Sequence, residues 1–392
     1  MKLTTPAAAR RGAGALAIAA IVIAACAAPS PPSDRPATAS PSGQPLVTAS
    51  PTTSGGATSS PSGVPSVPAP SVRGLPPGPA LPAHVFAPYM ELYTGDRILA
   101  VAQASGARYM TLAFLETTGT ESCQLGWNGA TGFDDAGGEQ VIEDTAALRA
   151  LGGDVIPSFG GYSADTSGGE IGDSCADPKA IADGYAAVIA MLGATRLDMD
   201  VEVESLGRPD GIDRRNKALR ILQDRFAAQG RTVEVQYTLP TSPKGLDAGG
   251  LAVLQNAVAN GTRVDIVNIM TFDYYDGSTT DMAAAAISAA GGVHAQLAKL
   301  FPDRTAAQLW AMVGITLMPG IDDYPQKTET TTLGHARRVL AFARAHGIAG
   351  LSMWALQRDH GTCPGEPGKD GCSGIEQADW AFTKLLSGFT GP

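Results

Sequence analysis

Three carboxylates stand at alternate positions of the stretch 196–202. They are Asp198, Asp200 and Glu202, separated by Met and Val. In a β-strand, residues two apart share a face and are separated by roughly 6.6 Å, so the three acids would point the same way. Ionised groups crowded on one face of a covered strand are costly unless they are paired or protonated. A solvated edge strand is the simpler interpretation, but the apolar neighbours favour a strand covered on both faces. We therefore predict a catalytic carboxylate relay.

The elements that must position these acids follow an alternating pattern from Pro82 onward. Eight short apolar runs rich in β-formers are predicted strands: 85–89, 109–114, 154–159, 196–202, 233–239, 264–271, 312–318 and 349–354. Stretches with Ala and Leu at helical spacing lie between them: 95–105, 143–151, 178–192, 213–229, 251–260, 280–300, 304–309 and 332–345.

This count and size predict an α/β fold, a (β/α)8 TIM barrel of about 310 residues. The strands are nearly continuous apolar runs, as in sheets covered by helices. A doubly wound open sheet is the alternative, but no Gly-rich dinucleotide fingerprint follows the first strand.

Function in such a barrel lies at the carboxyl ends of the strands. Unusual residues gather there: Glu202 after the fourth strand, Asp273 and Tyr274 after the sixth, and Trp354 at the end of the eighth. Aromatic faces stack on sugar rings and carboxylates bind hydroxyls. The pattern therefore predicts an acidic, aromatic-walled sugar site.

Four pieces in this order resemble glycoside hydrolase family 18, the family of chitinases and endo-β-N-acetylglucosaminidases. They are Ser158-x-Gly160-Gly161, Asp198-x-Asp200-x-Glu202, Met270-x-x-Asp273 and Trp354. The resemblance extends from about Pro82 to Leu386 and is greatest to a compact group of bacterial and archaeal chitinases. One Asp-x-Asp-x-Glu pattern is a weak signal, but the ordered set is specific.

The resemblance implies hydrolysis of β-1,4-N-acetylglucosamine linkages in chitin or chitooligosaccharides by a retaining, substrate-assisted mechanism. Glu202 is then the general acid and base, and the acetamido carbonyl of the substrate is the nucleophile that forms an oxazolinium ion. Asp200 would bind the acetamido N–H, and Asp198 would share a proton with Asp200. Asp273 and Tyr274 would hold the acetamido group from the other side, with Trp354 beneath it.

Other residues at or near strand ends are expected to line the cleft: Met270, Gln236, Tyr89 and Asp322. Ser158, Gly160 and Gly161 are interpreted as fold residues that let the backbone pass close to the acids. Asp359 is expected to pair with Arg358 or with a neighbouring loop. No metal ion and no organic cofactor is required.

The chain departs from the family pattern at three places. Thr195 replaces an Asp that commonly stands three residues before Asp198 and supports the relay. Phe272 replaces a common Tyr, with Tyr274 as the substitute, and Glu204 adds an acid that is either solvated or alters a subsite.

Two other functions remain open for the same barrel. One is release of N-glycans by an endo-β-N-acetylglucosaminidase, which would use the same three acids. The other is a non-catalytic lectin that binds chitin or N-acetylglucosamine. The presence of Glu202 favours an enzyme, because lectin-like relatives commonly lose the acid.

The charge balance excludes some partners. The formal net charge is -10 and only 17% of residues are charged, with no basic stripe of the kind that nucleic-acid binding requires. We expect a monomer that binds chitin or another oligosaccharide containing N-acetylglucosamine. Membrane contact is expected only through a lipid anchor.

The N-terminal region predicts export. Residues 1–26 combine Lys2, Arg10 and Arg11 with an apolar run and end in an Ile-Ala-Ala-Cys sequence typical of a lipobox, so Cys26 is a predicted lipidation site. Ordinary signal cleavage near Ala25 is the alternative. Residues 27–80 are rich in Pro, Ser, Thr and Ala and predict a disordered tether. Residues 81–392 form the predicted barrel of an extracellular or cell-surface lipoprotein.

Four further cysteines predict disulfides in an exported chain. We favour Cys123 with Cys175 and Cys363 with Cys372, although the sequence alone does not choose among the three possible pairings. A zinc site is unfavoured, because no Cys-x-x-Cys occurs and His is rare.

Overall fold

The computed structural model describes residues 74–130, 136–323, 329–366 and 370–391. The predicted signal segment, Cys26 and the tether as far as residue 73 lie outside the described residues. Everything below concerns the described part of the chain.

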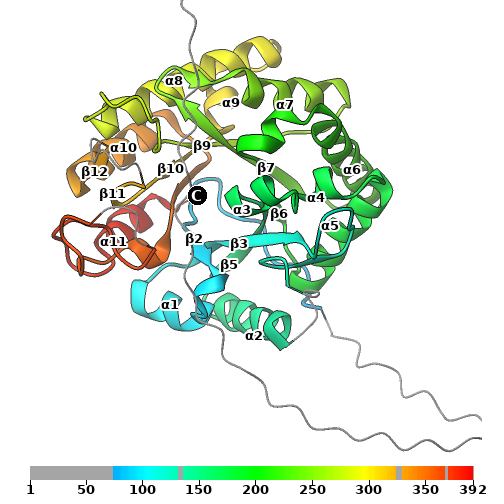
Figure 1. The fold of residues 1–392 in the computed structure, drawn as a ribbon, viewed down its shortest axis with the longest axis horizontal. Coiled ribbons are helices and arrows are strands. Elements are labelled where there is room, and N and C mark those ends of the chain that lie inside the picture. The colour runs from blue at the N-terminus through cyan, green and yellow to red at the C-terminus, as the bar shows by residue number, and fades with distance from the viewer. Residues whose placement is uncertain (1–73, 131–135, 324–328, 367–369, 392) are drawn as a thin grey trace, which may run out of the picture. The chain divides into compact units, whose positions relative to one another are not determined.

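A closed barrel of parallel strands forms the centre of the structure (Figure 1). Its first strand is broken into β1 (Val85–Phe86) and β2 (Tyr89–Glu91). The other seven are β3 (Tyr109–Thr117), β5 (Asp154–Gly160), β6 (Arg196–Asp200), β7 (Glu234–Ser242), β9 (Ile266–Met270), β10 (Val313–Leu317) and β13 (Gly350–Met353). The barrel closes because β2 pairs with β3 while β1 pairs with β13.

Helices surround these strands as a ring (Figure 1). The eight that follow the barrel strands are α1 (Ile98–Ser105), α2 (Ala136–Ala150), α5 (Pro178–Leu192), α6 (Pro209–Ala227), α7 (Ala248–Ala259), α8 (Met282–Leu300), α10 (Leu333–His346) and α11 (Ala381–Leu386). Their ends have local causes. The Asp177 side chain caps α5 by accepting from the Lys179 N–H, and Gly193, with φ 63°, ends the helix.

The register of β5, β6 and β7 brings polar residues level with one another inside the barrel. Asp198 is paired with Ser158 on one side and Gln236 on the other. Asp200 lies between Gly160 and Thr238 in the same way. Residues at the same level of adjacent parallel strands point to the same face, so the neighbours of each acid are fixed by the register.

The predicted barrel and its eight strands are confirmed, with shifts of a few residues at element ends. β6 ends at Asp200, so the prediction that it runs to Glu202 is wrong by two residues. Several short elements were not predicted: α3 (Tyr162–Ser167), α4 (Ile171–Ser174), β4 (Leu125–Trp127), β8 (Gly245–Leu246), and the hairpin of β11 (Gly320–Ile321) and β12 (Thr330–Thr331). The short helix α9 (Ala306–Trp310) lies within the predicted helical region before β10.

Both favoured disulfides are present. Cys123 and Cys175 have Cα atoms 4.7 Å apart, and Cys363 and Cys372 have Cα atoms 6.0 Å apart. The first ties the loop after β3 to the end of α4, and the second closes a loop near the C-terminus.

Both ends of the described chain lie at the amino-terminal face of the barrel. At one end the Leu75 N–H donates to the Met191 carbonyl at the end of α5. At the other end the Gly391 N–H donates to the carbonyl of His84, next to β1. Among all residues that the structure describes, no helix has the length and apolarity needed to cross a membrane.

Candidate active site

Asp198 is fully buried inside the barrel and surrounded by hydrogen-bond donors. Its Oδ2 lies 2.6 Å from Ser158 Oγ and 2.8 Å from the Tyr89 hydroxyl. Its Oδ1 lies 2.6 Å from Thr238 Oγ1 and 3.0 Å from Gln236 Nε2. Burial raises the pKa of Asp198, and these four hydrogen bonds oppose that rise because they stabilise the carboxylate.

Asp200, the next acid along the strand, has no such compensation. It is 3% exposed, and its Oδ1 has no hydrogen-bond partner among the described residues. Burial and the charges of Glu202, Asp198 and Asp165 raise its pKa well above the usual range. Of the two adjacent acids, Asp200 therefore holds a proton more readily than Asp198.

Glu202 follows the end of β6 in extended backbone and is only partly buried. Burial and then the charge of Asp273 raise its pKa to about 7, opposed by a hydrogen bond from the Tyr162 N–H. A partly exposed carboxyl group with this pKa can both give and take a proton near neutral pH.

Asp165 is a buried acid near this site that the sequence analysis did not single out. It lies in α3, directly after the Gly160–Gly161 turn, and its Oδ2 accepts the backbone N–H of Glu202. The sequence held a signal for it, since an Asp closely follows the Ser-x-Gly-Gly pattern, but α3 was not predicted.

Asp273 and Tyr274 follow β9, which is separated from β6 by β7 in the barrel. The Asp273 N–H donates to Asp322 Oδ2 at 3.4 Å, and the Tyr274 N–H donates to Glu329 Oε2 at 2.7 Å. Burial, with the charges of Asp323 and Glu329, raises the pKa of Asp273 to about 7. Both Asp273 Oδ1 and the Tyr274 hydroxyl are buried atoms without a hydrogen-bond partner in the described structure. The described protein therefore satisfies neither of these two atoms.

Trp354 directly follows β13 and is partly exposed. It packs against two other aromatic rings. It stacks on Phe114 and meets Tyr89 edge-on, with ring centroids 5.6 Å apart in the second pair. Phe114 in turn contacts Gly161, where an added Cβ would lie 2.6 Å from the Phe ring.

Several residues predicted to line the cleft are instead buried. Tyr89 and Gln236 donate to Asp198 and belong to its surroundings, not to an open wall. Asp322 is 1% exposed and holds the backbone of Asp273, while Met270 is 7% exposed. Met270 is the last residue of β9, whereas Tyr89 begins β2 and Gln236 is the third residue of β7. The sequence does not show which of these side chains turn inward.

Thr195 and Glu204, which depart from the family pattern, both lie within the described residues. Thr195 precedes β6, at the end of the strand opposite Glu202, and its hydroxyl donates to the Pro79 carbonyl. Glu204 is exposed in the short 3-10 helix η2 (Val203–Gly207). Asp359 accepts hydrogen bonds from the Phe382 and Thr383 N–H groups, so it anchors α11 and does not pair with Arg358.

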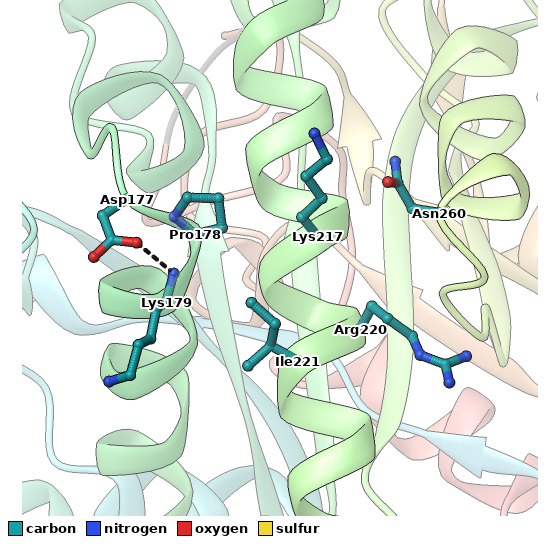
Figure 2. A pocket seen from close by; sticks show the side chains of 7 residues that line it. All are labelled: Asp177, Pro178, Lys179, Lys217, Arg220, Ile221 and Asn260. Carbon is teal, nitrogen blue, oxygen red and sulfur yellow. Dashed lines mark hydrogen bonds between the residues drawn. The ribbon is translucent and has the colours of Figure 1, made fainter.

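A hollow of about 410 Å³ lies elsewhere, on the outer surface of the helices (Figure 2). It is lined by Asp177, Pro178, Lys179, Lys217, Arg220, Ile221 and Asn260. Its cations are paired with neighbouring acids: Lys179 with Asp183, Lys217 with Asp213, and Arg220 with Asp224. Asp200, Glu202 and Asp273 lie at or just after the carboxyl ends of barrel strands and have raised pKa values, so the candidate site is there and not in this hollow.

Across the described ranges, no group of three or more His, Cys, Asp or Glu side chains is arranged to hold a metal ion. The candidate site is made of two groups of residues. The first is the acids of β6 together with Glu202 and α3, and the second is Asp273 with Tyr274. Trp354 lies among them at the rim.

The family model for glycosyl hydrolases family 18 matches residues 85–320, which include β1 to β10. The chain belongs to glycosyl hydrolase family 18. Curated members are similar to it: it is 31% identical over 330 residues to the probable bifunctional chitinase/lysozyme of Escherichia coli (strain K12), covering 80% of this chain and 35% of that protein. It is also 31% identical over 295 residues to endochitinase 11 of Metarhizium anisopliae, covering 72% of this chain and 54% of that protein. The chain thus spans only about a third and about half of these relatives' length.

Among solved family members, the chain is similar to active domain 2 of a thermostable chitinase from Pyrococcus furiosus. A catalytic-site mutant of that domain in complex with chito-oligosaccharides has a TM-score of 0.69 and 30% identity, covering 79% of this chain and 95% of that chain. The catalytic domain of the hyperthermophilic enzyme gives a TM-score of 0.68 at 29% identity, with 79% and 96% covered.

Proposed function

We propose that this protein hydrolyses β-1,4-N-acetylglucosamine linkages in chitin or chitooligosaccharides, with Glu202 as the general acid and base and retention of configuration. The observation that supports this most is the contrast among Asp198, Asp200 and Glu202. Glu202 is partly exposed with a pKa of about 7, whereas Asp200 is buried with a more strongly raised pKa and Asp198 has four hydrogen-bond donors.

In the first step, protonated Glu202 gives its proton to the glycosidic oxygen as the bond from that oxygen to C1 breaks. The carbonyl oxygen of the substrate's acetamido group forms a new bond to C1, which gives a cyclic oxazolinium ion. Asp200 accepts the acetamido N–H and stabilises the developing positive charge. Asp273 and Tyr274 hold the acetamido group through atoms that have no hydrogen-bond partner in the described protein.

In the second step, the Glu202 carboxylate removes a proton from water, and the water oxygen attacks C1. The oxazolinium ring reopens, the acetamide is restored, and Glu202 is again protonated. One water molecule is consumed for each bond cleaved. Two inversions at C1 give net retention.

The direct test compares Glu202→Gln with Glu204→Gln on chitooligosaccharides. Glu204 is exposed and two residues further along, so it is a matched control for loss of a carboxylate in the same segment. We expect Glu202→Gln to lower kcat by at least about 100-fold, because general acid–base catalysis contributes about 10²–10⁴-fold. Turnover of Glu202→Gln close to that of the control would overturn the assignment.

Product analysis separates this reaction from its alternatives. Retention predicts that the β-anomer appears first in NMR spectra of the products, and substrate assistance predicts that chitosan deacetylated at the cleaved unit does not react. Release of N-glycans from a glycoprotein without cleavage of chitooligosaccharides would indicate an endo-β-N-acetylglucosaminidase. Binding without any product would indicate a lectin.

We also infer that the protein is exported. Two disulfides form within the described residues, and disulfides persist mainly in oxidising compartments. Cell fractionation of the wild type and of Cys26→Ser tests both the location and the proposed lipid anchor. Wild-type protein retained in the cytoplasm with all cysteines reduced would contradict the inference.

A further inference from the structure

The short helix α3 contacts Glu202 at two points. The Asp165 carboxylate accepts the backbone N–H of Glu202, and the backbone N–H of Tyr162 donates to the Glu202 side chain. Tyr162 and Asp165 are both in α3, which begins directly after Gly161. The position of the proposed acid therefore depends on this six-residue helix as well as on β6.

Asp165 is itself fixed from several directions. It is fully buried, and its own N–H donates to the Gly161 carbonyl at 3.0 Å. Gly160, the partner of Asp200 in the sheet, lies so close that a Cβ added there would be 3.6 Å from Asp165 Oδ1 and 2.2 Å from the Asp200 carbonyl oxygen. Asp165 Oδ1 thus lies beside the backbone at the point where β5 pairs with β6.

We propose that Asp165 is a positioning residue for Glu202, and that it works as a neutral carboxyl group that locks the backbone at the end of β6. This inference rests on the proposed function of Glu202. Asp165 does not touch the reacting atoms, so its effect must pass through the placement of the Glu202 side chain.

The surroundings favour the neutral form of Asp165. Three carboxyl groups interact electrostatically with Asp165: Glu170 at the start of α4, Glu202, and Asp200 on β6. The cation Arg215 of α6 opposes this effect, but it already pairs with Glu170 at 2.6 Å. Burial, then Glu170, raises the pKa of Asp165 to about 9. The Asp165 Oδ1 atom, moreover, has no hydrogen-bond partner in the described ranges, which would leave an ionised oxygen unsatisfied.

A neutral carboxyl group has a consequence for the choice of variant. Asn has the same shape as a protonated Asp, and its carbonyl oxygen can still accept the Glu202 N–H. Ala leaves that N–H without its acceptor in a buried place, where an unmade hydrogen bond is costly. Asn should therefore restore what Ala removes.

The experiment measures kcat, KM and the pH profile of kcat/KM for Asp165→Ala and Asp165→Asn on a chitooligosaccharide. We expect Ala to lower kcat by roughly 10- to 100-fold with little change in KM, since a small displacement of a catalytic group has effects of this size. We expect Asn to recover most of the loss and to leave the alkaline limb of the profile in place. Asp154→Asn is the control, because Asp154 is equally buried but lies at the start of β5, at the other end of the barrel.

Three results would overturn the inference. The first is wild-type kcat for Asp165→Ala. The second is an Asn variant no better than the Ala variant. The third is a shift of the alkaline limb to lower pH in Asp165→Asn, which would mean that an ionised Asp165 normally raises the pKa of Glu202. Circular dichroism verifies folding, and the Asn profile remains decisive if the Ala variant does not fold.

The proposed function fails on different measurements. If the wild type does not cleave chitooligosaccharides, or if Glu202→Gln retains turnover, the assignment of Glu202 is wrong. If Glu202→Gln is inactive while both Asp165 variants behave like the wild type, only the positioning role is wrong.

Discussion

The indole ring of Trp354 lies nearly parallel to the ring of Phe114, with centroids 5.5 Å apart and an angle of 15° between the planes. Phe114 belongs to β3 and Trp354 directly follows β13, so the stack links two barrel strands that flank the broken first strand. Phe114 is buried, whereas Trp354 keeps a partly exposed surface at the rim. The stack therefore fixes the orientation of the exposed indole surface.

We expect Phe114→Ala to weaken chitooligosaccharide binding about 3- to 10-fold, because an aromatic pair contributes about 0.5–1.5 kcal/mol beyond burial. Calorimetry in a Glu202→Gln background measures the Kd without turnover. Phe389→Ala is the matched control, since Phe389 is also buried but lies near the C-terminus beneath the barrel. Equal affinity of the two variants would show that Phe114 does not support the binding surface.

The backbone conformation and close surroundings of Gly160 lead to a second prediction. Its φ is 98°, and an added Cβ would lie 2.2 Å from the Asp200 carbonyl oxygen. Gly160→Ala should therefore lower the free energy of unfolding and also displace Asp200, with a loss of kcat. Gly95→Ala separates strain from collision, because Gly95 has φ 81° but no atom within 4 Å of an added Cβ.

Gly95→Ala should cost about 1–2 kcal/mol, the strain of the left-handed conformation alone. Gly160→Ala should cost clearly more. Urea unfolding gives both values. A cost for Gly160→Ala equal to that for Gly95→Ala would mean that the Asp200 segment can move aside.

The pH dependence of activity follows from Glu202, whose pKa is about 7. The first step requires its protonated form, so kcat/KM should be highest below pH 7 and fall above it. A pH–rate profile in the wild type locates this limb. If kcat/KM fell only at a pH several units higher, the general acid would be a group other than Glu202.

The same raised pKa affects stability. The pKa of Glu202 rises from 4.5 in its ordinary state to about 7 in the fold, so the folded state binds more protons between these values. The contribution of Glu202 to stability is therefore full below pH 4.5 and is lost as the pH rises to about 7. Gln at this position does not ionise, so Glu202→Gln should raise the free energy of unfolding at pH 8 by roughly 1–3 kcal/mol relative to wild type, and by less at pH 4.5. Equal differences at the two pH values would contradict this account.

The two disulfides should differ in their contribution. Cys123–Cys175 closes a loop with a sequence separation of 52, whereas Cys363–Cys372 has a separation of 9. Loop-closure entropy then gives about 4 kcal/mol for the first and about 3 kcal/mol for the second. The double Cys→Ser variants, compared by urea unfolding, should lose stability in that order. The reverse order would indicate that native-state packing dominates.

The barrel could be predicted from sequence because its strands are apolar runs alternating with amphipathic helices at regular intervals. The acids of β6 could be predicted because alternate spacing in a strand puts them on one face. Asp165 could not, since α3 has six residues and is held by contacts with Glu202, η2 and β5 and not by its own helical pattern. Glu329 was missed for a similar reason: it precedes the short hairpin strand β12, whose pairing with β11 is tertiary.

The sequence also could not predict that the side chains of Tyr89 and Gln236 point into the barrel toward Asp198. Both have side chains that suit a sugar cleft, and the sequence predicted them at or near strand ends. Their direction depends on the register of neighbouring strands, which places Gln236 beside Asp198. The sequence therefore locates the site but does not distinguish the residues that would touch substrate from those that hold the acids.

The contacts of Leu75 with Met191 and of Gly391 with His84 have a practical consequence. Both lie at the face of the barrel opposite Glu202. A purification tag or a bead attached at either end of the described domain would leave the cleft facing the solution. The domain should thus be suited to immobilisation on a solid support, where insoluble polymer can still reach it.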